Sequence, residues 1–124
     1  RGLMALAGGL VRLPRRIPRS IALEAIATGE PFTAQRALQL GLVNHVSEPG
    51  LVLERAVLLA RAVASNSPIA VQESMKIARS TDEVPEEELS ARGMAVRADL
   101  EKTEDYAEGL RAFAEKRAPN WRGR

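Results

Sequence analysis

Residues 7–20, with the sequence AGGLVRLPRRIPRS, combine a glycine pair with four arginines and are a first candidate for anion chemistry. Glycines ahead of a helix can bring backbone N–H groups close to a phosphate. The segment has neither the GxGxxG spacing nor the lysine of a P-loop. A phosphate site is therefore supported only by the composition of the segment and by no recognised motif. Close helix packing beside a solvated arginine face explains the same residues. A nucleic-acid-binding arm is disfavoured because no aromatic residues alternate with the arginines.

The end of the chain is a second candidate, because Phe113 and Lys116 lie three residues apart and would share one side of a helix. Further cations and a tryptophan follow: Arg117, Trp121, Arg122 and Arg124. An apolar surface with an ammonium at its edge would suit a long ligand that carries a phosphate. If Phe113 instead packs internally, the cations form a solvated face, and the pattern leaves both interpretations open.

The other titratable residues predict no catalytic or metal site. His45 is the only histidine and the chain has no cysteine, so a zinc site is implausible. No serine lies in a nucleophile elbow. Glu24, amid alanine and leucine, is a candidate for partial burial, with a salt bridge to an arginine favoured over catalysis. Among the remaining carboxylates, residues 86–88 form a hydrated cluster, and none lies in a pattern that predicts acid–base work.

The composition indicates a folded, disulfide-free protein. Of 124 residues, 45% are apolar and 27% are charged, and the absence of cysteine fits a reducing compartment, so we expect the cytoplasm. No apolar run approaches the roughly 20 residues of a membrane span, and the first residues do not resemble a signal peptide. The formal net charge is only +2, but residues 1–20 carry five arginines and no acid. This uneven charge favours an anionic partner.

The hydrophobic periodicity predicts a mainly helical chain. Helices are expected at residues 19–28, 34–40, 51–64, 68 to about 78, 85–102 and 104–117. Ser20 and Thr33 are predicted N-caps, and Gly29 is a predicted helix stop. The segment LVNHV, residues 42–46, is the one predicted strand. A single strand has nothing to pair with, so the chain looks like the second half of a larger fold.

Four segments resemble, in order, the C-terminal half of the crotonase superfamily, with the strongest likeness to actinobacterial-type enoyl-CoA hydratases: AGGLVRLPRRIP, ALEAIATGEPFTAQRALQLGLVNHV, ASNSPIAVQESMKIA and EDYAEGLRAFAEKRAPNW. The resemblance covers essentially the whole chain. It implies a mainly α fold class, namely the C-terminal helical (trimerisation) part of the α/β crotonase spiral fold with one short strand. Residues 1–50 would end the crotonase core, and residues 51–124 would form the trimerisation region.

The resemblance also implies an activity, the hydration of 2-enoyl-CoA thioesters in fatty-acid or related acyl-CoA metabolism. Family members stabilise the thioester enolate with two backbone N–H groups, and hydratases use two glutamates to position water. The residues equivalent to these groups would all precede Arg1, so no catalytic residue is predicted in this chain. Leu6 replaces a glycine that often approaches the reacting water in the family. No metal or cofactor is expected, because CoA is part of the substrate.

Phe113 and Lys116 match positions that, in family oligomers, reach the acyl-CoA site of a neighbouring subunit. The resemblance assigns them as substrate-binding residues, Phe113 at the acyl or pantetheine region and Lys116 at the CoA phosphates. The expected partners are acyl-CoA and further copies in a trimer or hexamer, with no nucleic acid and no membrane. The alternative is a catalytically inactive, truncated assembly module. In either case we expect the isolated chain to lack hydratase activity and to self-associate through exposed apolar surface.

Overall fold

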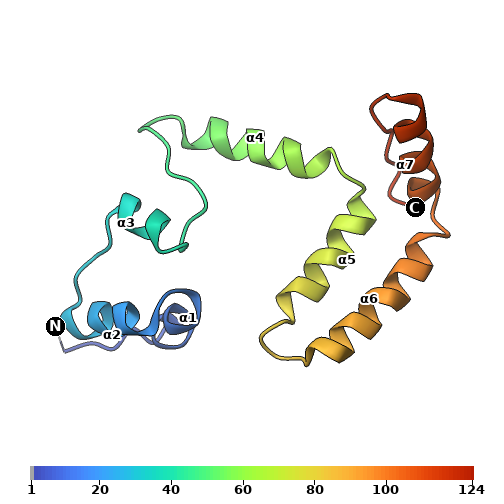
Figure 1. The fold of residues 1–124 in the computed structure, drawn as a ribbon. Helices are drawn as coiled ribbons and strands as arrows, with labels where there is room; N and C mark the ends of the chain where they lie inside the picture. Colours follow the sequence, from blue (N-terminus) through green and yellow to red (C-terminus); the bar gives the residue numbers. More distant parts are fainter. Residues whose placement is uncertain (1) are drawn as a thin grey trace. The chain divides into compact units, whose positions relative to one another are not determined.

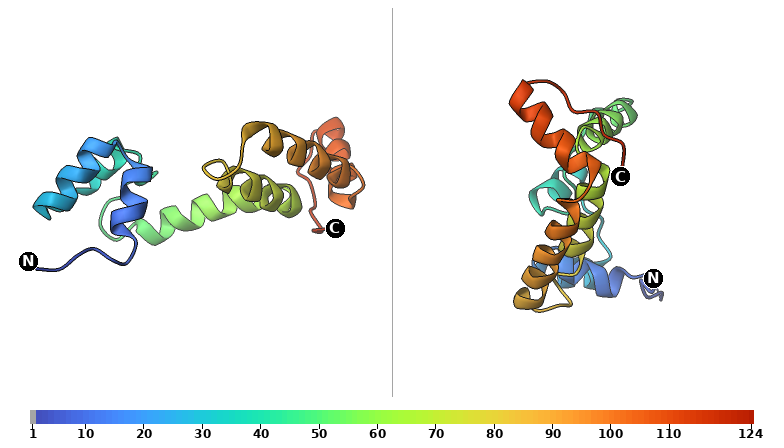
Figure 2. Two further views of the ribbon diagram at one scale, coloured as in Figure 1. Left: turned by 90° about the horizontal axis from the view of Figure 1, so that it is seen from below. Right: turned by 90° about the vertical axis from the view of Figure 1, so that its right-hand side faces the viewer.

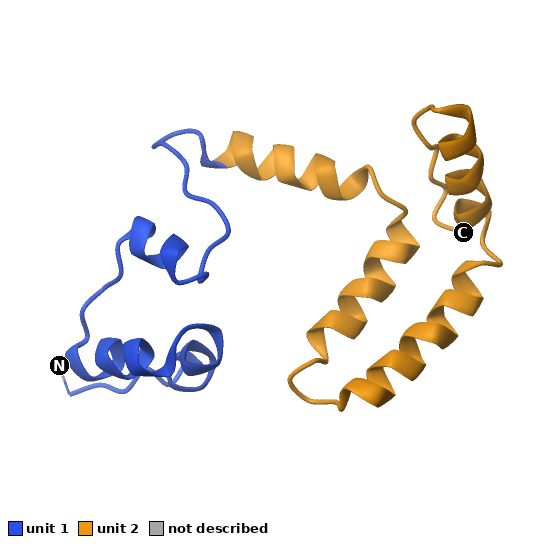
Figure 3. Cartoon of the chain, in the orientation of Figure 1, with its two compact units in different colours: residues 1–52 blue, residues 53–124 orange. Residues whose placement is uncertain are grey.

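The computed structural model describes residues 2–124, and in this part of the chain it contains α-helices and no strand (Figure 1). The helices are α1 (Gly9–Arg16), α2 (Arg19–Thr28), α3 (Ala34–Gln39), α4 (Val52–Ala64), α5 (Pro68–Arg79), α6 (Glu86–Leu100) and α7 (Glu104–Glu115). The chain divides into two compact units, residues 1–52 and residues 53–124 (Figure 3). The mainly α fold class is therefore confirmed.

In the first unit, the helix ends follow from local chemistry. Thr33 caps α3 as predicted, because its Oγ1 accepts a hydrogen bond from the Arg36 N–H at 3.1 Å. Gly29 ends α2 as predicted, with φ at +71°. The prediction that Ser20 caps α2 is wrong. The carbonyl of Pro18 already accepts the Ala22 N–H at 3.1 Å, so the helix begins before Ser20.

The predicted strand at residues 42–46 does not form. The N–H groups of Leu42 and Val43 both donate to the carbonyl of Ala37, at 2.9 and 3.4 Å. This turn after α3 consumes the amides that a β-ladder would need. No other segment of residues 2–124 is a strand that could pair with residues 42–46, so the β-branched residues there lack a partner.

In the second unit, α5 and α6 form an antiparallel pair joined by a short turn (Figures 1 and 2). Pro68 occupies the first position of α5 as predicted, where its missing N–H costs no helical bond. Gly93 does not interrupt α6, which runs continuously past it. Leu89 is the buried apolar residue of this helix pair.

Very little of the described chain is fully buried. The buried apolar side chains are Ile17, Ala22, Ala37, Leu89 and Ala112. Helix α4 buries no residue, although its apolar positions recur at helical spacing, and Leu53 in its first turn is 76% exposed. Among residues 2–124, no helix combines the length and the apolar character that crossing a bilayer demands.

Candidate functional site

The glycine pair at Gly8 and Gly9 begins a helix rather than a phosphate cradle. Gly8 has φ +96° and precedes α1, and the Arg12 guanidinium folds over it so closely that a Cβ there would collide with it. Arg12 Nη2 donates to the carbonyl of Ala7 at 2.6 Å. Glycine is favoured here because φ is positive, whereas the flexible Arg12 side chain could move away from a Cβ. The structure therefore favours the packing interpretation of this segment over an anion site.

Helix α7 has an uncovered apolar face. Thr103 caps its start, accepting a hydrogen bond from the Tyr106 N–H at 3.1 Å. Tyr106, Leu110 and Phe113 recur at helical spacing and form an apolar stripe, with exposed fractions of 40%, 59% and 87%. Internal packing of Phe113, the simpler of the two interpretations of the sequence, is thus wrong for residues 2–124. Its ring is available to a ligand or to another chain.

Lys116 lies directly after α7 in a left-handed conformation, with φ +54° and ψ +40°. It is the only residue other than glycine with positive φ in residues 2–124. Its N–H donates to the carbonyl of Phe113 at 3.3 Å, and the next N–H, that of Arg117, donates to Ala112 at 3.0 Å. The left-handed residue that follows a helix is usually glycine, so a lysine at this position carries a conformational cost.

Arg117 is held by α7 through a charge-assisted pair. Its Nη1 donates to Glu108 Oε1 at 2.6 Å and its Nη2 donates to Oε2 at 3.1 Å, a bidentate contact that we call the Glu108–Arg117 clamp. The backbone N–H of Asn120 also donates to Oε1, at 2.8 Å. The pKa of the buried Glu108 carboxyl is lowered to about 2. The largest cause is the hydrogen bond from Arg117, and the hydrogen bond from the Asn120 N–H adds to it. Arg117 further pairs with Glu115.

The end of the chain folds back on α7 and is fixed by a second carboxylate. Asp105 is only 1% exposed, and its oxygens accept hydrogen bonds from the backbone N–H groups of Arg122, at 2.7 Å, and Gly123, at 3.1 Å. The Ser67 hydroxyl donates to the same carboxylate at 3.2 Å. The Asp105 N–H in turn donates to the carbonyl of Arg124 at 3.1 Å. Residues 117–124, the C-terminal tail, are thereby joined both to α7 and to the start of α5.

The cations around Trp121 are not equivalent. The indole N–H of Trp121 donates to the carbonyl of Ser65 at 2.8 Å, and its ring lies against Gly109. Arg122 and Arg124 both pair with Glu104 at 3.6 and 3.2 Å, and Arg117 is held in the clamp. Lys116 has no ion pair with any carboxylate in residues 2–124. Of the predicted basic cluster, Lys116 is therefore the cation left available for a ligand.

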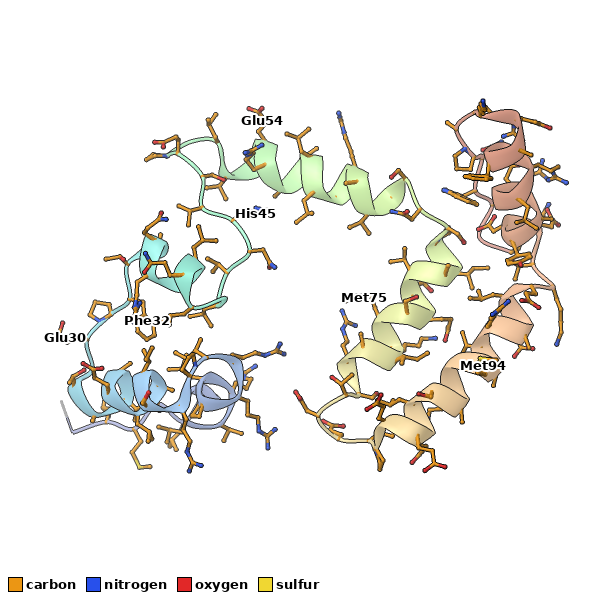
Figure 4. All side chains as sticks on the ribbon, viewed as in Figure 1. Glu30, Phe32, His45, Glu54, Met75 and Met94 are labelled. Atoms are coloured by element: carbon orange, nitrogen blue, oxygen red, sulfur yellow. The ribbon has the colours of Figure 1, made fainter. Side chains whose placement is uncertain are left out.

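The acids that the structure brings together around α7 and the tail already have partners. A hollow of about 280 Å³ lies between α7 and the tail, but its three acids are already occupied: Asp105 and Glu108 accept the hydrogen bonds described above, and Glu104 pairs with two arginines of the tail. His45 is exposed in the coil between α3 and α4 (Figure 4). Residues 2–124 bring together no group of metal-ligating side chains. Glu24 is exposed rather than half-buried and forms no ion pair within this range, so its predicted environment is wrong.

The sequence patterns did not predict the structural roles of Asp105 and Glu108. Both belong to an acidic segment, EDYAEG, that reads as solvated helix surface. The available signal is the pairing of acids in the first turns of a helix with a basic, proline-interrupted tail directly after it. Such a tail can return along the helix and present backbone N–H groups to those acids.

Comparison with known proteins decides the family. The enoyl-CoA hydratase/isomerase family model matches residues 1–124. The chain belongs to the enoyl-CoA hydratase/isomerase family. Among curated relatives, it is 39% identical to the enoyl-CoA hydratase EchA19 of Mycobacterium tuberculosis, an alignment that covers 98% of this chain and 46% of the relative. It is 40% identical to the 2,3-dehydroadipyl-CoA hydratase of Escherichia coli, over 99% of this chain and 48% of that protein.

Solved structures agree with this assignment. The crystal structure of enoyl-CoA hydratase EchA1 from Mycobacterium marinum superposes with a TM-score of 0.93 and 41% identity, and the match covers all of this chain and 51% of that one. The chain of this family member thus spans about half the length of the relatives it matches, and it corresponds to their C-terminal half. The resemblance noted from the four sequence segments is confirmed.

Proposed function

We propose that this chain supplies the substrate-facing C-terminal region of an enoyl-CoA hydratase that adds water to 2-enoyl-CoA thioesters in acyl-CoA metabolism. The observation that carries the proposal is the pairing of an exposed aromatic ring, Phe113, with an unpaired ammonium, Lys116, at the end of α7. A CoA thioester offers an apolar acyl and pantetheine arm for the first and phosphates for the second. The family assignment and the named hydratase relatives support the same substrate class.

Within this proposal the residues of the chain bind and do not react. Lys116 contributes a point charge to a phosphate, the role for which a flexible ammonium is suited. Phe113 covers the adjacent part of the arm and removes apolar surface from water. The groups that polarise the thioester and position water are expected in the other half of the family fold. The proposed reaction uses no metal or redox cofactor, because CoA belongs to the substrate.

We further propose that the enzyme works in the cytoplasm as an assembly of copies of the protein, a trimer or a pair of trimers. The uncovered apolar residues of α4 and the apolar stripe of α7 support this proposal, because exposed apolar faces of this kind mark interaction surfaces. The assembly would bring Lys116 and Phe113 of one copy to the acyl-CoA of a neighbour.

A chimera tests the proposed activity. This chain would replace the C-terminal half of EchA19, the M. tuberculosis relative, and hydration of crotonyl-CoA would be followed by loss of the enoyl thioester absorbance. We expect turnover, with Lys116→Ala raising KM about tenfold and leaving kcat nearly unchanged, because the lost contact acts on binding alone. A folded, oligomeric chimera without turnover would contradict the proposal. The isolated chain is expected to show none.

A matched control separates the effect of the Lys116 ammonium on KM from the effect of the overall charge of the protein. Lys76 lies on α5 and pairs with Glu73, so Lys76→Ala removes the same charge at a position that the proposal leaves out of the site. We expect Lys76→Ala to keep the KM of the unchanged chimera. An equal rise in KM for Lys76→Ala and Lys116→Ala would show that only the overall charge matters.

A further inference from the structure

We infer that the Glu108–Arg117 clamp is a positioning element that holds Lys116 in its left-handed conformation and thereby fixes its ammonium for the phosphate end of the substrate. The inference rests on the proposed function, since it adds to the same site two residues that need not touch substrate. Its basis is that lysine occupies a backbone conformation that usually favours glycine. A glycine would occupy position 116 at lower cost, yet the sequence has lysine there.

The geometry explains how the conformation is enforced. Arg117 is attached to α7 twice, by its N–H at the carbonyl of Ala112 and by its guanidinium at both oxygens of Glu108. Asn120 adds a third attachment, because its N–H donates to Glu108 as well. The chain must therefore reverse direction within the single residue between α7 and Arg117. A left-handed conformation at Lys116 accomplishes that reversal, and the clamp stabilises it in addition to the backbone hydrogen bonds.

The clamp also pairs the charged groups around Lys116 with one another. Glu108 and Glu115 occupy the Arg117 guanidinium, so this cation is neutralised beside Lys116. The carboxylate of Glu108 is in turn occupied by its donors and is not free to pair with the lysine ammonium. Of the basic cluster at residues 116–124, Lys116 is left as the cation without a carboxylate partner among residues 2–124. A backbone that is already held in one conformation loses less entropy when the ligand binds.

For Glu108→Gln, the change in overall charge and the positioning role predict opposite changes in CoA affinity. Glu108→Gln removes a negative charge nine residues before Arg117, and simple electrostatics predicts tighter binding of an anionic ligand. The positioning role predicts weaker binding, because the released Arg117 allows Lys116 to leave its conformation. Glu104→Gln is the matched control: it removes one carboxylate from the same helix, one that pairs with Arg122 and Arg124 instead.

The experiment measures CoA affinity of the EchA19 chimera described above by isothermal titration calorimetry, with circular dichroism to check that each variant is folded. We expect Lys116→Ala to weaken CoA binding about tenfold and Glu108→Gln to weaken it about threefold, while Glu104→Gln leaves it unchanged or tighter. Arg117→Lys, which conserves charge but loses the bidentate contact, should weaken binding like Glu108→Gln. This variant also keeps the test open if Glu108→Gln does not fold.

A double-mutant cycle distinguishes positioning from general destabilisation. If the clamp acts through Lys116, Glu108→Gln costs nothing further once Lys116 is alanine, so the double variant binds CoA as Lys116→Ala does. Additive losses, or wild-type affinity in both Glu108→Gln and Arg117→Lys, would overturn the inference while leaving the proposed function intact. Absence of CoA binding by the unchanged chimera, or wild-type affinity in Lys116→Ala, would overturn both.

Discussion

Helix α7 with the C-terminal tail and helix α4 belong to the same unit but are stabilised in contrasting ways. Around α7, two buried carboxylates accept hydrogen bonds from tail amides, from the Ser67 hydroxyl and from Arg117. Helix α4 has more apolar residues and buries none of them. The first region is held by specific polar contacts within the chain, whereas the second presents apolar side chains that nothing else in residues 2–124 buries.

The contrast shows where stability resides in this part of the family fold. An isolated helix of 13 residues such as α4 is marginal in water, and its apolar face normally contributes by burial. The tail contacts need no further partner, because both carboxylates are already hydrogen-bonded among residues 2–124. We therefore expect the α7 end to persist in the isolated chain and α4 to depend on assembly.

The largest expected effect is at Asp105. Asp105→Ala removes the acceptor of two backbone amides and one hydroxyl, and should lower the free energy of unfolding by about 3 kcal/mol, because buried donors are left without partners. Urea denaturation at fixed protein concentration measures this, since self-association would otherwise shift the midpoint. Leu53→Ala in α4 is the contrasting variant and should change the stability of the isolated chain by far less. Equal losses at the two positions would remove the distinction between the regions.

The second effect is a pH dependence at Glu108. Its pKa is lowered to about 2, mainly by the hydrogen bonds from Arg117, so the folded state favours the ionised form. The resulting stability is fully present above the ordinary carboxyl pKa of 4.5 and is lost as the pH falls toward 2. Thermal denaturation between these pH values should show a steeper loss for the unchanged chain than for Glu108→Gln. Parallel profiles would assign the acid sensitivity to other groups.

A smaller effect is expected at Trp121. Trp121→Ala removes the hydrogen bond to Ser65 and the contact with Gly109, and should cost about 2 kcal/mol, whereas Trp121→Phe keeps the ring contact and should cost about 1 kcal/mol. The same denaturation series measures both variants. If the two lose stability equally, ring packing contributes nothing, and the tail is joined to the end of α4 by the hydrogen bond alone.

Much of this architecture could be predicted from the sequence. The helix periodicity, the Thr33 cap and the Gly29 stop depend on local chemistry, and the structure has all three. The strand at residues 42–46 was wrong because a strand depends on a partner, and the local amides turn back to Ala37 instead. Local patterns cannot reveal which surfaces a partner covers.

The candidate site likewise contains residues that the sequence indicated and residues that it did not. The family resemblance assigned Phe113 and Lys116 as substrate-binding residues; the structure exposes both, and their contact with substrate stays a prediction. The carboxylates that hold the tail were missed, because Asp105 and Glu108 find their partners only after residues 117–124 reverse direction. A contact between residues that lie 17 positions apart, such as Asp105 with the Arg122 amide, leaves no periodic signal in the sequence.

The central claim is that position 116 keeps a strained backbone for the sake of its lysine side chain, and Lys116→Gly tests it most directly. Glycine relieves the left-handed conformation, so the free energy of unfolding should rise by about 1 kcal/mol relative to Lys116→Ala, which keeps the Cβ. Both variants should lose CoA affinity about tenfold, since neither has the ammonium. The account predicts a more stable chain that binds CoA poorly. A glycine variant that binds CoA like the unchanged chain, or that is less stable than the alanine variant, would contradict it.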